Sequence, residues 1–239
     1  MYLKAKFFKY QFNNRELIFD YFGLYSYNTN CMNKLKTLIY PVGKYNPKYT
    51  KYIGWSFISN TIASTQHALS VHNMLLAIDS DTTEIARTMN YIGKDIIGQI
   101  GSLGYMAKMA KKADQKPTKF LNYAHVAQQS SYLAICSTPL LSSEYFLLLA
   151  GSANIMSNIS FAGFGAINAK CISNLAEDNN IGEIYAKITI INTLGSSLGM
   201  LLGLFITSLY PDNNCRMLFI PILGILRIYT FNKAIEGIL

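Results

Sequence analysis

Long apolar stretches separated by short polar turns run through residues 52–238 of the chain. The turns contain Pro or clustered Asp and Asn residues, which end helices. The pattern predicts six helices, with expected bounds of 52–78, 82–112, 118–137, 143–171, 181–210 and 215–238. Neither an alternation of strands and helices nor an internal repeat is evident. The pattern therefore predicts an all-α bundle of about six long helices.

The first 38 residues have a mixed pattern that does not continue the helical periodicity. Residues 15–27 have the composition of a short strand or hairpin. Pro41, Gly43 and Pro47 then interrupt regular structure before the first long apolar stretch. We therefore divide the chain into a small N-terminal appendage, residues 1–38, and a helical domain, residues 39–239.

Glycines recur at helical spacing in two of the expected helices. Gly195, Gly199 and Gly203 are four residues apart in an uncharged segment, and Gly98 and Gly101 are three apart in another helix. Glycines at these spacings share one helix face, along which the backbone of a second helix can approach closely. We predict close helix packing at these five positions.

The composition favours a membrane environment for this bundle. Hydrophobic residues make up 51% of the chain and charged residues 14%, against about 25% charged residues in ordinary soluble domains. The net charge of +8 suits an anionic membrane surface. No basic run is interleaved with aromatic residues, so nucleic acid is not an expected partner. We expect a membrane-embedded or membrane-associated protein, in a compartment that the sequence does not specify.

Residues with obvious catalytic or metal-binding spacing are absent from the sequence. The four cysteines form no CxxC pair and are interpreted as reduced thiols. His67 and His72 are five residues apart, not the four that place two imidazoles on one helix face, and His125 has no partner nearby in sequence. We interpret the histidines as hydrogen-bonded residues at helix interfaces. No catalytic residue, metal site or cofactor is predicted.

Four charged residues form the candidate polar site, Lys94 and Asp95 in the second helix and Glu183 and Lys187 in the fifth. Lys94 and Asp95 are interpreted either as a polar site within the bundle or as an ion pair that holds two helices in register. Adjacent helix residues point about 100° apart, so we expect Lys187 to be the partner of Asp95. The i, i+4 spacing of Glu183 and Lys187 favours a local salt bridge.

Five segments, in the same order and at helix-scale spacing, resemble the root UVB sensitive family, also called the DUF647 domain. They are YPVGKYNPKYTKYIGW (40–55), KDIIGQIGSLGY (94–105), NLAEDNNIGEIYAK (174–187), LGSSLGMLLG (194–203) and RIYTFNKAIEGIL (227–239). The resemblance covers residues 38–239. The bias toward Asn, Ile, Lys and Tyr is typical of AT-rich genomes, viral ones among them.

The chain departs from the family pattern where the family carries charged or hydrogen-bonding residues. Ser56 stands for an Asp, Asn174 for a His, Ile167-Asn168 for Thr-Arg, Ile191-Asn192 for Gln-Glu, and Gln128-Gln129 for Asn-Asp. These differences imply a divergent member whose site has lost part of the family's charge. We also expect the chain to be shortened, because many members carry a further domain after the last helix.

The resemblance implies a membrane-associated or organellar protein, in a family linked to UV-B responses and vitamin B6 homeostasis. We expect a non-enzymatic protein that binds a small ligand or another protein, either a second copy or another family member. One alternative is a transporter-like unit that oligomerises to form a pathway. Another is an enzyme acting on a pyridoxal-type vitamer, which would need a lysine such as Lys94 or Lys187 in a cavity.

Overall fold

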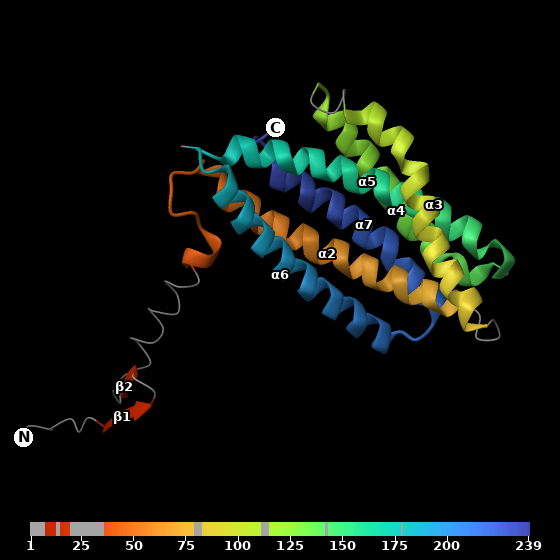
Figure 1. The fold of residues 1–239 in the computed structure, drawn as a ribbon, viewed down its shortest axis with the longest axis horizontal. Helices are drawn as coiled ribbons and strands as arrows, with labels where there is room; N and C mark the ends of the chain where they lie inside the picture. Colours follow the sequence, from red (N-terminus) through yellow and green to blue (C-terminus); the bar gives the residue numbers. More distant parts are fainter. Residues whose placement is uncertain are drawn as a thin grey trace, which may run out of the picture. The chain divides into compact units, whose positions relative to one another are not determined.

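Six long helices form the main body of the protein in the computed structural model, which describes residues 8–12, 15–19, 36–78, 83–110, 115–141, 143–177 and 179–239. They are α2 (Lys48–Ala77), α3 (Glu84–Ala110), α4 (Pro117–Cys136), α5 (Phe146–Leu175), α6 (Ile181–Leu209) and α7 (Asn213–Ile235). Two short 3₁₀ turns, Thr138–Leu140 and Ser143–Tyr145, connect α4 to α5. The predicted all-α bundle is confirmed (Figure 1).

The chain separates into two units, Met1–Val42 and Gly43–Leu239. The first unit contains β1 (Phe8–Phe12) and β2 (Arg15–Phe19), which pair antiparallel with Phe8 opposite Phe19. The strand expected within residues 15–27 corresponds to β2, and residues 20–27 lie outside the described part of the chain.

Local sequence signals explain where several helices begin. Helix α2 begins at Lys48, four residues earlier than predicted, and the Lys48 backbone N–H donates a hydrogen bond to the Asn46 side chain at 3.0 Å. Pro117 is the first residue of α4. A backbone N–H at that position would have no hydrogen-bond acceptor within the helix, so proline costs nothing there. Asn179 has a φ of 64°, which turns the chain between α5 and α6. Helix α5 begins at Phe146 because the preceding three residues form a 3₁₀ turn.

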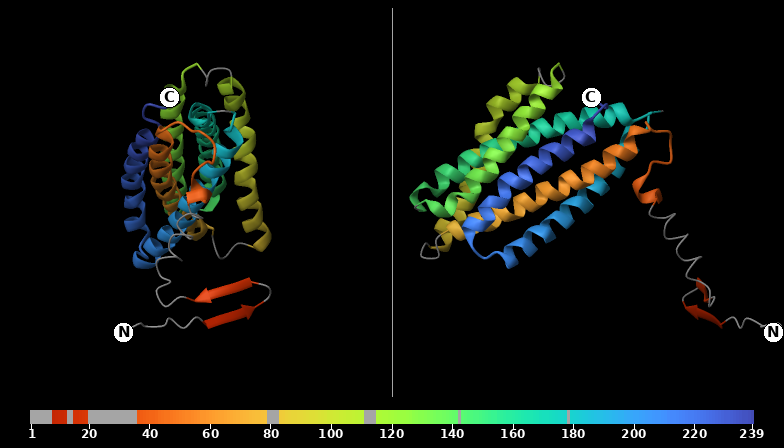
Figure 2. Two further views of the ribbon diagram at one scale, coloured as in Figure 1. Left: turned by 90° about the vertical axis from the view of Figure 1, so that its left-hand side faces the viewer. Right: turned by 180° about the vertical axis from the view of Figure 1, so that it is seen from behind.

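Helix α2 lies at the centre of the bundle, with α6 and α7 packed along it on different sides (Figure 1). It also contacts α4. Helices α3 and α4 pack mainly on α5, and Figure 2 shows this second group beside the first from two further directions. Helix α4 connects this second group to the rest of the bundle, because it packs against both α2 and α7.

The inner surface of α2 is unusually polar for a central helix. Its buried residues include Gln66, and the Gln66 amide nitrogen donates to the Gln129 side chain and to the Ile220 carbonyl, each at 2.8 Å. These bonds connect α2 to α4 and α7. Gly224 lies beside them, and a Cβ there would lie 2.8 Å from Cδ of Gln129, so a larger residue would displace the Gln129 side chain. Hydrogen bonding as well as apolar packing therefore holds the three helices together.

The glycines of α6 lie against α2. A Cβ added at Gly195 would lie 2.8 Å from the Phe57 carbonyl oxygen, and one at Gly203 would lie 2.6 Å from the Ala68 Cβ. A Cβ at Gly199 would lie 2.8 Å from the Ser64 Cβ. The Gly199 carbonyl in turn accepts a hydrogen bond from the Thr65 hydroxyl at 3.0 Å. The two backbones can come this close only because these positions carry no side chain.

Large apolar side chains cover the outer surfaces of α6 and α7. They include Leu201, Leu204, Phe205, Leu218, Ile222 and Ile225, each more than half exposed. Such contiguous apolar surface is uncommon on soluble monomers. Helices α5, α6 and the Arg216–Ile235 segment of α7 are long and apolar enough to cross a membrane.

Candidate functional site

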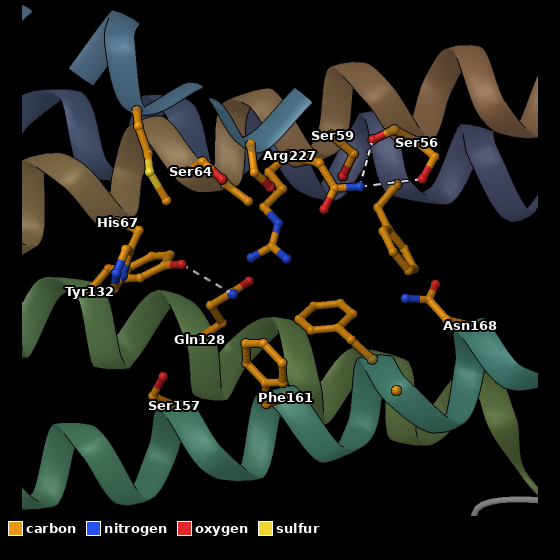
Figure 3. Close-up of a pocket in the computed structure, with 17 residues that line it drawn as sticks. Ser56, Ser59, Ser64, His67, Gln128, Tyr132, Ser157, Phe161, Asn168 and Arg227 are labelled. Atoms are coloured by element: carbon orange, nitrogen blue, oxygen red, sulfur yellow. Dashed lines mark hydrogen bonds between the residues drawn. The ribbon is translucent and has the colours of Figure 1, made fainter. Parts of the chain in front are cut away.

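A cavity of about 390 Å³ lies among the helices and opens to the surface near Phe161, which is 77% exposed. It is lined by residues of α2, α4, α5, α6 and α7 (Figure 3). Most of its hydrogen-bonding groups are neutral, and they belong to Ser56, Ser59, Asn60, Ser64, His67, Gln128, Ser157, Asn168 and Ser196. Aromatic rings of Tyr132, Phe161, Phe164 and Phe231 supply much of the remaining wall. Arg227 is the charged residue among the described lining residues. The cavity thus combines neutral hydrogen-bonding groups, aromatic rings and a positively charged side chain.

Hydrogen bonds between neutral side chains organise one end of this region. Asn192 Oδ1 accepts from the Ser56 hydroxyl at 3.0 Å and from the Asn60 amide at 2.8 Å. The Tyr52 hydroxyl donates to Asn168 Oδ1 at 3.2 Å. The family resemblance led us to expect charged residues at the positions of Ser56, Asn168 and Asn192. In this chain the same positions form a neutral network.

Arg227 enters the cavity from α7, in the middle of an apolar stretch. The residue is 7% exposed, and its guanidinium carbon lies 4.6 Å from the centroid of the Phe164 ring. The guanidinium also interacts with the Tyr132 hydroxyl, which accepts a hydrogen bond from Gln128 Nε2 at 3.3 Å. Two guanidinium nitrogens, Nε and Nη1, have no hydrogen-bond partner among the described residues, and neither does Gln128 Oε1.

His125 lies near Arg227 and His67 lines the cavity, and the pKa of each is lowered. His125 packs between the rings of Phe164 and Phe231, with centroid separations of 5.0 and 5.5 Å. Burial, with a smaller contribution from Arg227, lowers the pKa of His125 to about 3. Burial also lowers the pKa of His67, and the nearby Lys94 lowers it further. Arg227 is thus the cationic side chain of the described cavity wall.

The interpretation of the histidines needs a correction. His125 does lie at a helix interface, but neither of its ring nitrogens has a hydrogen-bond partner in the described part of the chain. Aromatic contacts replace the expected hydrogen bonds. Among the described residues, no three His, Cys, Asp or Glu side chains gather as a metal site would require. Cys136 and Cys171 are buried free thiols.

The candidate polar site does not assemble as predicted. The Lys94 ammonium lies 2.7 Å from Asp95 Oδ1, and the Asn154 amide of α5 donates to the same oxygen at 2.9 Å. The expected Asp95–Lys187 pair is therefore wrong. Helix α3 packs on α5, whereas α6 carries Lys187 along α2. The directions of the Lys94 and Asp95 side chains differ by about 100° at the helix surface. The lysine side chain is long enough to bend back to the adjacent carboxylate.

The two halves of that site have separate surroundings. Lys94 is 9% exposed and lies over the Tyr91 ring, 4.2 Å from its centroid. Glu183, at the start of α6, accepts a hydrogen bond from the Gly43 backbone at 3.5 Å. Neither Lys94 nor Lys187 is among the residues lining the cavity. The Lys94–Asp95 pair joins α3 to α5 through Asn154.

The predicted packing glycines all lie against neighbouring helices. Gly195, Gly199 and Gly203 face α2, as described above. On α3, a Cβ at Gly98 would lie 2.8 Å from the Asn154 Cβ, and one at Gly101 would lie 2.7 Å from Cγ1 of Ile155. Gly98 thereby allows Asn154 to reach Asp95.

One family model and two curated proteins match this chain. The family model described as the vitamin B6 photo-protection and homoeostasis domain matches residues 27–239. "Protein root UVB sensitive 4" of Arabidopsis thaliana is 28% identical over 176 residues, which cover 72% of this chain and 34% of that protein. "RUS family member 1" of Dictyostelium discoideum is 24% identical over 192 residues, which cover 78% of this chain and 36% of that protein.

The chain thus spans about a third of the length of the curated relatives it matches. No solved structure matches it. The family model covers all six long helices, including every residue that lines the cavity. The chain is therefore a divergent member of the root UVB sensitive family, whose shared region is the vitamin B6 photo-protection and homoeostasis domain.

Proposed function

We propose that this protein is a membrane-associated, non-enzymatic binding protein that holds a small polar ligand in its central cavity. The observation that carries the proposal is a cavity with a hydrogen-bonding lining inside a bundle whose outer helices are apolar. A volume of about 390 Å³ falls at the lower end of the range of small-molecule sites. The ligand is accordingly a small metabolite.

The apolar outer surfaces support the membrane association. Helices α5 and α6 and most of α7 have the length and hydropathy of membrane spans. In water, the exposed leucine, isoleucine and phenylalanine side chains of α6 and α7 would favour aggregation. In a bilayer the same side chains face lipid, while the polar residues of α2 are shielded inside the bundle.

The chemistry of the cavity supports binding over catalysis. In the described part of the chain, its wall contains no Lys, Cys, Asp or Glu, so it offers neither an amine for imine formation nor a carboxylate for acid–base work. The transporter-like alternative has no observation in its favour among the described residues. Binding of another family member or of a second copy remains an expectation from the family resemblance.

The family description makes a vitamin B6 compound the first ligand to test. One aromatic ring with polar substituents suits a wall that combines aromatic rings with hydroxyl and amide groups. We propose that the protein contributes to vitamin B6 homeostasis by holding such a vitamer without converting it.

Two glycines allow a sharp test of the cavity. Gly165 lines the cavity, and a Cβ added there would meet nothing within 4 Å, so Gly165→Leu fills the space. Gly104 on α3 is equally open but lies outside the cavity lining, so Gly104→Leu is the matched control. Equilibrium dialysis of pyridoxine and pyridoxine 5′-phosphate against protein in non-ionic detergent should show binding to the parent and the control only.

The proposal would be contradicted by a protein that remains soluble without detergent after washing from membranes. It would equally be contradicted by Gly165→Leu protein that is folded and binds the probes as tightly as the parent. The vitamers should also be recovered chemically unchanged, since turnover would contradict the non-enzymatic role.

A further inference from the structure

Arg227 is an ionised side chain placed where an ionised side chain is costly. It lies in the apolar segment Arg216–Ile235, which has the length and composition of a membrane span, and it is 7% exposed. Charged residues inside membrane-spanning bundles are rare because they must be desolvated, and they commonly mark a ligand or ion site. Packing alone does not account for an arginine here, since leucine or methionine would fill the same volume more favourably.

The guanidinium is only partly compensated by the protein. Its contacts among the described residues are the Phe164 ring and the Tyr132 hydroxyl. Nε and Nη1 are left without acceptors, and no acidic residue lies in the described cavity wall. Buried arginines normally have carboxylate, phosphate or carbonyl partners. Arg227 lines the cavity, so the missing acceptor for these two buried nitrogens indicates that a ligand supplies it.

The surroundings of Arg227 complement an anion. Figure 3 shows the guanidinium between Ser59 and Ser64 of α2 and Gln128 of α4. Hydroxyl groups can donate to the same anion that the guanidinium binds. Stacking on the Phe164 ring holds the guanidinium by one face and leaves its N–H edges directed elsewhere.

We propose that Arg227 binds the anionic group of a small organic ligand, a phosphate monoester or a carboxylate. The remainder of the ligand occupies the aromatic side of the cavity near Phe161 and Phe231. This inference rests on the proposed function, because it assigns the chemical class of the ligand to the same cavity. Arginine suits this role because its planar donor groups match the oxygens of both anions.

The neutral network at the other end of the cavity agrees with this assignment. Ser56 donates a hydrogen bond to Asn192 at 3.0 Å, so these two polar groups are neutral. A carboxylate at either position would add negative charge to the same region. Its absence leaves the charge of Arg227 available to a ligand.

Isothermal titration calorimetry in non-ionic detergent can test the role of Arg227 with three probes: pyridoxine, pyridoxine 5′-phosphate and inorganic phosphate. None of them carries an aldehyde, so surface lysines cannot form imines with them. A charge-assisted contact predicts that the parent protein binds pyridoxine 5′-phosphate about tenfold or more tightly than pyridoxine. Arg227→Gln should bind the two with similar affinity.

Two further variants separate the charge from the fold. Gln128→Glu keeps the side-chain shape and places a carboxylate beside the Tyr132 hydroxyl, where it competes with the ligand for Arg227. It should lose the preference for the phosphorylated probe, as Arg227→Gln does. Lys233→Gln removes an exposed cation from the same helix and should keep that preference. If Arg227→Gln does not fold, the Gln128→Glu result decides.

The outcomes distinguish this inference from the proposed function. Equal affinity of the parent for pyridoxine and its phosphate would overturn the role of Arg227 while leaving ligand binding intact. Binding of inorganic phosphate alone, lost in Gln128→Glu, would support the anion site and contradict the vitamin B6 assignment. Failure of all three probes to bind the parent would overturn both.

Discussion

The closest approach between α2 and α6 occurs at Gly199, and alanine there is the smallest possible perturbation. The added methyl group would lie 2.8 Å from the Ser64 Cβ and would also collide with the Thr61 carbonyl oxygen. Ordinary van der Waals contacts of a Cβ begin at 3.4 Å. Because a backbone carbonyl cannot rotate away as a flexible side chain does, the two helices must separate.

Overpacking of this kind costs about 1–3 kcal/mol. For a chain of this length, the midpoint of thermal unfolding falls by roughly 2–4 °C for each kcal/mol. Gly199→Ala should therefore lower the midpoint by about 2–12 °C. The unfolding can be followed in detergent by the fluorescence of Trp55, the single tryptophan of the chain.

Gly54→Ala is the matched control. Gly54 also lies within a helix, but a Cβ there would meet nothing within 4 Å. Alanine in an open helical position stabilises by roughly 0.5–1 kcal/mol, so this variant should unfold at a slightly higher temperature than the parent. The close-packing argument fails if Gly199→Ala is as stable as Gly54→Ala.

Two further predictions concern the polar groups within the bundle. Asp95→Ala and Asn154→Ala should each destabilise by about 1–2 kcal/mol, with a double variant that is less than additive, because the two side chains share a hydrogen bond. Asp95→Ala and Lys187→Ala should be additive, and coupling between them in thermal unfolding would contradict the assignment of Lys94 as the ion-pair partner. The pKa of His125 is lowered by burial from 6.5 to about 3, so its neutral form stabilises the fold fully above pH 6.5 and this stabilisation is lost as the pH falls toward 3. His125→Phe should therefore be less sensitive to acid between pH 6.5 and 4, and an unchanged slope of stability against pH would refute this.

The helices and their glycine-lined faces could be predicted because both depend on local sequence. Apolar periodicity and breakers such as Pro117 fix the helices to within a few residues. The four-residue spacing places Gly195, Gly199 and Gly203 on one face whatever lies opposite. The glycine spacing could not predict which helix packs against that face of α6. The helix is α2, which is more than 100 residues away in the sequence.

The cavity could not be predicted from the same signals. Its wall combines residues of five helices, and its serines and asparagines come from α2, α5 and α6. The sequence gives no sign of which of these helices contact one another. The Asp95–Lys187 pair failed for the same reason, because helix pairing was inferred from shared motifs without knowledge that α3 packs on α5. Arg227 did carry a signal. It is a lone charge in the apolar run from Met217 to Phe231, a pattern that marks a functional position when the helix lies inside a membrane.

Native mass spectrometry of the protein released from non-ionic detergent, with pyridoxine 5′-phosphate present, measures occupancy of the cavity directly. We predict one bound molecule per chain for the parent and for Gly104→Leu, and none for folded Gly165→Leu. A parent protein that carries no ligand at saturating concentration, or a Gly165→Leu protein that carries as much as the parent, would contradict the conclusion that the cavity is the binding site.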